Sequence, residues 1–180
     1  GIYARAALAG RALSRLLARV AARRPDLEID VLAHSLGARV ALEAAAARPD
    51  LPLGRMLFLG AAERTGPARA AMDRLEAAGS RASVYHFLSR ANDPYDAIFG
   101  VLAPRVRRGN APLGLRGLGE ARRGWLDIQL DHPAVAAWLT GRGMALERLG
   151  ERVSHWHFYA DPGAMRFYRA ILRERRAHAI

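Results

Sequence analysis

Short apolar runs alternate with longer amphipathic stretches along most of the chain. Four runs have the length and composition of strands, and they lie at residues 27–32, 56–59, 82–88 and 125–130. The run at 56–59 is apolar throughout, which is typical of a strand covered on both faces. Helical patterns lie at residues 1–24, 36–47, 67–78 and 161–172. This alternation predicts an α/β fold in which a mostly parallel sheet carries helices on both faces.

The last helix has the clearest boundaries, whereas the first helix allows two interpretations. Asp161 can cap the last helix and Pro162 occupies its first position. One apolar stripe runs along it, formed by Ala164, Phe167, Tyr168, Ile171 and Leu172. The first helix has many arginines and no acid, so it looks superficially like a transit peptide. Its apolar spacing favours a surface helix of the fold, with a stripe formed by Leu13, Leu16, Leu17 and Val20.

The stretch from Pro104 to Gly124 breaks the alternation. It is rich in Gly and Arg and has little periodicity, so it predicts a long loop or lid-like insertion, 104–124. The chain has 180 residues, of which 51% are apolar, enough for one core and too few for two ordinary domains. We therefore expect a single domain over residues 1–180 that contains this insertion.

The composition excludes several kinds of site. The chain has no cysteine, which rules out disulfides, thiolate metal sites and a cysteine nucleophile and leaves the redox compartment open. No apolar run approaches the roughly 18 residues that span a bilayer, and we expect a cytoplasmic protein. The net charge is +11, and all 28 basic residues are arginine. The absence of lysine favours a bias toward Arg and Ala codons over an anionic binding surface as the cause.

One segment, residues 31–40, carries a chemical signal. It reads V-L-A-H-S-L-G-A-R-V, so a strand runs straight into a helix with Ser35 at the junction. A sharp strand-to-helix turn crowds the positions two residues before and after its centre, which here are Ala33 and Gly37. Such a turn raises the serine above the sheet, beside the unpaired and partly positive N–H groups of the next helix. The simpler alternative is a serine that only caps a helix.

This segment resembles the nucleophile elbow of the α/β-hydrolase superfamily, whose pattern is G-x-S-x-G; Ala33 stands here for the first glycine. The resemblance covers nearly the whole chain and points to bacterial esterase- and lipase-like members. It implies an α/β-hydrolase fold, with Ser35 as the nucleophile and the backbone N–H of Leu36 as an oxyanion donor. The first strands of that fold, which carry another oxyanion donor, are missing. We therefore expect the intact protein to continue before Gly1.

The superfamily order is nucleophile, acid, histidine, and the acid follows a later strand. Asp93 lies five residues beyond the third predicted strand, in a loop where Pro94 biases it toward an extended backbone. We expect Asp93 to orient the catalytic imidazole. Two alternatives stay open: Asp96 in the same stretch and Glu63 after the preceding strand. Asp93 could instead only cap the helix that follows it.

The histidine is expected between the last strand and the last helix, where the chain reads V-S-H-W-H-F-Y. His155 resembles the catalytic histidine of lipase-like members, in which histidine and aromatic residues precede a helix that starts near Asp-Pro. It would take the proton of Ser35 and return it to the leaving group. His157 is the alternative base, and the two histidines could instead pack among the aromatic residues or share a metal. The remaining histidines are weaker candidates: His34, His86, His132 and His178.

These residues predict a serine hydrolase that cleaves a carboxylic ester through an acyl-Ser35 intermediate, with no cofactor and no metal. The substrate would be a small-molecule or lipid ester, and peripheral membrane contact is left open. The alternative is a non-catalytic hydrolase-like module that binds an anionic partner through its arginine surface. Nucleic acid is not expected as that partner, because the chain has no nucleic-acid motif and its aromatic residues are few and scattered.

Overall fold

The computed structural model describes residues 1–103, 110–148 and 152–174. Four strands form one sheet in the order β1-β2-β3-β4, and each strand pairs in parallel with the next. Their bounds are Ile29–His34 for β1, Leu53–Leu59 for β2, Ser83–Leu88 for β3 and Trp125–Gln129 for β4. The strands alternate with helices, so the expected α/β fold with a parallel sheet is confirmed.

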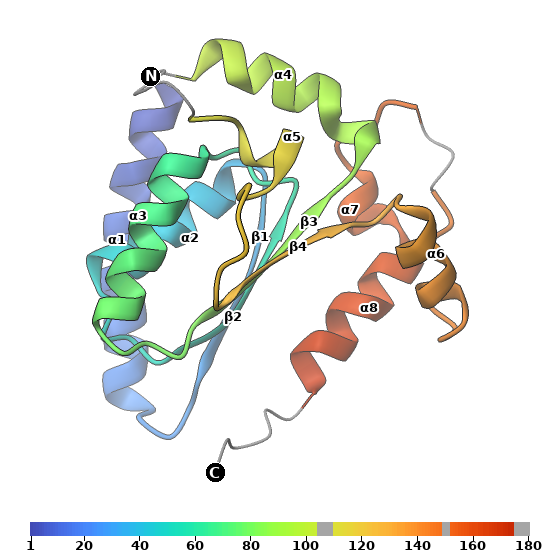
Figure 1. Cartoon of the computed structure of the whole chain (residues 1–180). Coiled ribbons are helices and arrows are strands. Elements are labelled where there is room, and N and C mark those ends of the chain that lie inside the picture. The colour runs from blue at the N-terminus through green and yellow to red at the C-terminus, as the bar shows by residue number, and fades with distance from the viewer. Residues whose placement is uncertain (104–109, 149–151, 175–180) are drawn as a thin grey trace.

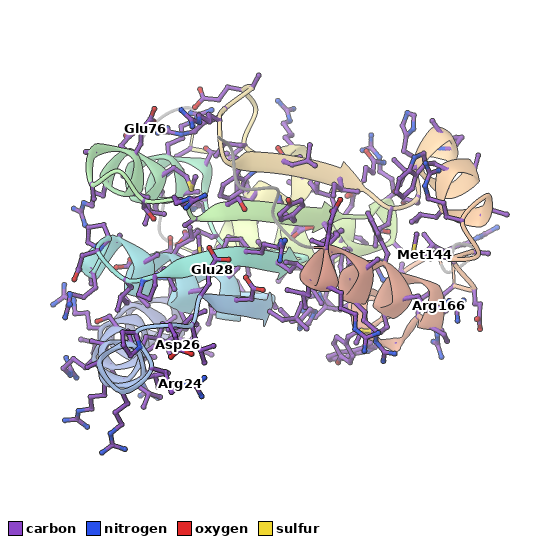
Figure 2. The ribbon with its side chains drawn as sticks, turned by 90° about the horizontal axis from the view of Figure 1, so that it is seen from below. Arg24, Asp26, Glu28, Glu76, Met144 and Arg166 are labelled. Atoms are coloured by element: carbon purple, nitrogen blue, oxygen red, sulfur yellow. The ribbon has the colours of Figure 1, made fainter. Side chains whose placement is uncertain are left out.

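Helices cover both faces of this sheet (Figure 1). One face carries α1 (Ile2–Arg23), α2 (Leu36–Ala47) and α3 (Thr65–Ala77). The other face carries α6 (Pro133–Thr140), α7 (His157–Ala160) and α8 (Pro162–Arg173). A third group follows the carboxyl end of β3 and comprises η1 (Arg90–Asn92), α4 (Asp93–Leu102) and α5 (Leu113–Arg116). Figure 2 shows the two covering layers from below, with Glu76 of α3 on one side and Arg166 of α8 on the other.

Two hydrophobic clusters lie between the sheet and its covering helices. Successive side chains of a strand point to opposite faces. In β2, Met56 and Phe58 therefore enter the cluster under α2 and α3, whereas Leu57 and Leu59 enter the cluster under α8. Every residue of β2 is buried, and the predicted apolar run at 56–59 forms its second half. None of the described helices combines the length and the hydropathy needed to cross a membrane.

The predicted start and packing face of the last helix are confirmed. Asp161 Oδ1 accepts a hydrogen bond from the Ala164 N–H at 3.0 Å, and Pro162 is the first residue of α8. The predicted stripe packs into the cluster under α8, since four of its members are buried and Leu172 lies against them.

The first helix packs through small residues and through only part of the expected stripe, since Leu17 lies against the core whereas Leu16 and Val20 do not. Leu16 and Val20 are 55% and 41% exposed. The buried residues of α1 are Ala6, Gly10 and Ser14. The reason is the close approach of α1 to α2: a Cβ atom on Gly10 would lie 2.5 Å from the Cβ atom of Glu43. The expectation that Leu16 and Val20 face the core is therefore wrong.

The described part of the predicted insertion packs against the core through two of its leucines. Residues 104–109 lie outside the described residues. Farther along, Leu113 and Leu118 are fully buried in the cluster under α2 and α3. The Leu118 N–H donates to Asp127 Oδ2 of β4 at 2.8 Å. Arg64, directly before α3, donates through Nη1 to the carbonyl oxygen of Asn110 at 2.8 Å. These contacts hold the segment against β4 and the start of α3.

Candidate active site

Ser35 stands in a strained turn between β1 and α2. Its backbone angles are φ 54° and ψ −122°. Among the described residues it is the only non-glycine residue with a positive φ. Such a backbone costs on the order of 1–3 kcal/mol and persists only where the surrounding structure enforces it. Strain of this kind clusters at functional sites, which marks Ser35 as a candidate.

Backbone hydrogen bonds to the next strand enforce this turn. The Ser35 N–H donates to the carbonyl oxygen of Leu59 at 2.9 Å, and the Ser35 carbonyl oxygen accepts from the Ala62 N–H at 3.0 Å. A Cβ atom on Gly37 would lie 3.6 Å from the Cβ atom of Ala33, so these two positions face each other across the turn. At this distance the two Cβ atoms would be in ordinary van der Waals contact, so small side chains fit at both positions.

The turn presents Ser35 at the amino end of α2. Leu36 is the first residue of that helix, and the N–H groups of a first helical turn have no partner within the helix. Ser35 and Leu36 line the same cavity. The helix end also contributes a partial positive charge. An oxygen that gains negative charge beside Ser35 can therefore bind the Leu36 N–H.

The cavity beside Ser35 has a volume of about 330 Å³. It lies where the segments after β1, β2 and β3 meet, at the carboxyl edge at which parallel sheets commonly bind ligands. Most of its wall is apolar and comes from the start of α1 and from α4. Besides two tyrosines, the polar side chains that line it are Ser35, Asp96 and His155. No hydrogen bond joins Ser35 to His155 among the described residues, and such bonds are often long before substrate binds.

The ring of His155 is half-buried in the wall of this cavity. Its Nδ1 lies 2.6 Å from Oδ1 of Asn92. The ring stacks on Tyr95 and contacts His34, with centroid distances of 4.9 and 4.3 Å. Burial, together with the nearby His34 and His157, lowers the pKa of His155 to about 4. The imidazole is therefore neutral at pH 7, which is the state that accepts a proton.

The structure places Asn92, and not Asp93, against His155. Asp93 is the first residue of α4, with φ −48° and ψ −40°. Its carboxylate lies 3.5 Å from Nη1 of Arg90. The extended backbone expected before Pro94 is therefore wrong, because Pro94 occupies the first turn of α4 and Asp93 is already helical. The short helix η1 turns the preceding residue, Asn92, inward.

Asp96 contacts Asn92, and Asn92 in turn contacts His155. The Nδ2 group of Asn92 donates to Oδ2 of Asp96 at 2.8 Å. The Asp96 side chain is buried, and this burial raises its pKa to about 7, with a further contribution from the charge of Asp93. A Cβ atom on Gly114 of α5 would overlap the Asp96 carboxylate, so this glycine provides the space that the carboxylate occupies.

The partners of Glu63 are Tyr3, Arg39 and Arg64, and His155 is not among its described partners. Its Oε2 accepts from Nη1 of Arg39 at 2.6 Å, and its Oε1 accepts from the hydroxyl of Tyr3 and from the Arg64 N–H. Burial and the bond to Glu63 raise the pKa of Tyr3. Tyr3 lines the cavity and Arg39 belongs to α2. Glu63 thus ties the α1 wall of the cavity to the helix that follows Ser35.

The two histidines nearest to His155 have structural partners. His157 is buried, with Nδ1 2.9 Å from the carbonyl oxygen of Ser154, and its ring packs on Phe158. His34 Nε2 lies 3.0 Å from the carbonyl oxygen of His155. Of the three, His155 is the one that lines the cavity with Ser35.

The remaining histidines lie elsewhere. His132 accepts from the Ala134 N–H at 3.2 Å and caps α6. His86 is fully buried in the sheet, with Nδ1 2.8 Å from Asp127. His178 lies outside the described residues. Within the described ranges, no three histidine or carboxylate side chains gather in a metal-binding group.

Asn92 is not among the residues that the sequence pattern predicted, although the pattern contains a signal for it. Asp93-Pro94 is a helix start, since proline is favoured in the first turn. That assignment places Asp93 in the helix and leaves Asn92 as the last residue before it. An amide there can orient a histidine, as in cysteine proteases that use asparagine in this role.

Comparisons with protein-family models, curated proteins and solved structures found no match for this chain. The structure defines an α/β fold with a four-stranded parallel sheet.

The raised pKa of Asp96 predicts a pH dependence of stability. The folded state keeps a proton that the unfolded state, with an ordinary pKa of 3.8, releases at lower pH. The contribution of Asp96 to stability is therefore fully present below about pH 4 and is lost as the pH rises through about 7. The free energy of unfolding of the wild type, relative to Asp96→Asn, should fall across this window by about 1.4 kcal/mol per unit of raised pKa.

Urea denaturation of both proteins at about pH 4, 6 and 8 measures this difference. Asp96→Asn is the matched variant because it keeps the shape of the side chain and cannot ionise. A difference that does not change with pH would contradict the raised pKa.

Proposed function

We propose that this chain is a serine hydrolase of the α/β-hydrolase superfamily that cleaves carboxylic esters through an acyl intermediate on Ser35. The observation that carries the proposal is the positive φ of Ser35 at the junction of β1 and α2, beside a cavity that His155 also lines. A nucleophile on a sharp strand-to-helix turn, at the carboxyl edge of a parallel sheet, is the arrangement of this superfamily.

In the proposed reaction, Nε2 of His155 takes the proton of Ser35 as the hydroxyl oxygen attacks the ester carbonyl carbon. The carbonyl oxygen becomes negatively charged and binds the Leu36 N–H. The tetrahedral intermediate then breaks its bond to the alcohol oxygen, and the alcohol leaves with the proton from His155. Water attacks acyl-Ser35 by the same route, which releases the carboxylic acid and restores the serine.

The cavity wall supports an apolar acyl group as the part of the substrate that is bound. Ile2, Ile98, Phe99 and Leu102 line it, and its volume of about 330 Å³ is typical of small-ligand pockets. Each methylene group buried there contributes about 0.8 kcal/mol. We therefore propose small-molecule or lipid esters with an aliphatic acyl chain as the substrate class.

A series of p-nitrophenyl esters tests this function. From acetate through butyrate to octanoate, kcat/KM should rise about fourfold for each methylene group that the cavity buries. Ser35→Ala should abolish turnover and His155→Ala should reduce it strongly. Ser80→Ala is the matched control, since this serine lies in the turn after α3 and its hydroxyl accepts from the Ala82 N–H. Equal rates for the wild type and Ser35→Ala would contradict the proposal.

One observation favours a second function, which is binding to an anionic surface. The helix α1 contains no acidic residue, and Leu8 and Leu16 on its outer side are 64% and 55% exposed. Five exposed arginines surround them: Arg5, Arg11, Arg15, Arg19 and Arg23. A helix face that combines cationic and apolar groups favours an anionic membrane surface.

Co-sedimentation with phosphatidylglycerol vesicles tests this second function. Binding should weaken steeply as the salt concentration rises and should be unchanged in Ser35→Ala. Replacing Arg11, Arg15 and Arg19 by Gln should weaken it, whereas binding that is independent of these arginines would reject α1 as the surface.

A further inference from the structure

Two neighbours constrain the amide group of Asn92. Its Oδ1 lies 2.6 Å from Nδ1 of His155, and its Nδ2 lies 2.8 Å from Oδ2 of Asp96. Asn92 is 1% exposed and Asp96 is 3% exposed, so bulk water does not compete for either contact. Two hydrogen-bond contacts thus connect the three side chains, and both outer members, Asp96 and His155, line the cavity beside Ser35.

The Asp96 carboxylate determines which end of the Asn92 amide faces His155. Above its pKa of about 7, Asp96 is ionised. Its oxygens then only accept hydrogen bonds, and only the NH₂ group of Asn92 can donate one to them. The carbonyl oxygen of Asn92 must then face the imidazole, where it also only accepts. Nδ1 of His155 therefore carries the proton, and Nε2 keeps the lone pair that a general base needs.

Without Asp96, the neutral ring of His155 alone would not favour either orientation of the Asn92 amide. A reversed amide would present its NH₂ group to Nδ1 of His155, and the ring proton would move to Nε2. In that tautomer His155 cannot accept the proton of Ser35. In a serine protease, an amide that forces this wrong tautomer lowers kcat by about 10⁴-fold.

We propose that Asp96 is a positioning residue that holds the amide of Asn92 in one orientation and so selects the His155 tautomer with an unprotonated Nε2. The catalytic consequence of this inference rests on the proposed function of Ser35 and His155. The tautomer itself does not, because it can be observed without any substrate. The fold provides for Asp96, since Gly114 leaves the space in which its carboxylate lies.

The test reads the tautomer from the ¹⁵N chemical shifts of protein labelled with ¹⁵N-histidine. At about pH 8 the imidazole of His155 is neutral and Asp96 is ionised. The spectrum of His155→Gln identifies the His155 signals. The wild type should show the Nδ1–H form. Asp96→Leu removes the acceptor and should populate the Nε2–H form, with kcat for the ester lower by about 10²- to 10⁴-fold and little change in KM.

A double variant separates positioning from folding. Asn92→Asp combined with Asp96→Asn exchanges the carboxylate and the amide, so that a carboxylate oxygen faces Nδ1 in either orientation. This variant should recover the Nδ1–H form and most of kcat, and circular dichroism checks that each variant is folded.

Other outcomes overturn the inference. They are a persistent Nδ1–H form in folded Asp96→Leu, an Nε2–H form in the folded double variant, and a change of tautomer caused by Asp93→Asn instead. If the tautomers change as expected but no variant or wild type turns over an ester, the inference on Asp96 stands and the proposed function fails.

Discussion

The hydrogen bonds that hold Ser35 at a positive φ are the constraint on which the candidate site depends. Leu59 and Ala62, at the end of β2 and just beyond it, bind the N–H and the carbonyl oxygen of Ser35. This clamp lets β1 pass into α2 without a loop, so the serine and the first N–H groups of the helix occupy one cavity wall. The sheet supplies the clamp because β1 and β2 pair in parallel and end at the same edge. The strain at Ser35 is thus stabilised by the same register that builds the sheet.

Burial beside the cavity shifts the pKa of two groups of the site, His155 and Asp96. Burial disfavours charge, so it lowers the pKa of His155 to about 4 and raises that of Asp96 to about 7. An imidazolium and a carboxylate in direct contact here would both have to be desolvated, which often costs more than their attraction returns. The amide of Asn92 connects the two groups without such an ion pair. Under the proposal for Asp96, this amide transmits one hydrogen-bond direction from Asp96 to His155.

Local pattern accounts for much of this fold, and contacts between distant segments account for what it missed. The helix at 36–47 and the cap at Asp161 follow from residues close in the chain, and both match the structure. The face of α1 depends on how closely α2 approaches Gly10, and the placement of Leu118 depends on where Asp127 of β4 lies. The sharp turn at Ser35 has a local sequence signature, and the structure contains that turn. The sequence predicted Asp93 as the partner of His155 because it is a carboxylate in the loop after the third strand. In the structure, the turn of η1 places Asn92 and not Asp93 inward.

Fluorophosphonate labelling with mass spectrometry tests most directly the central claim that Ser35 is an activated nucleophile. The reagent attaches to a serine whose hydroxyl can pass its proton to a neighbouring base. The account predicts modification at Ser35 in the folded wild type, none at this site in Ser35→Ala, and much slower modification in His155→Ala. A folded wild-type protein in which Ser35 stays unmodified would contradict the account.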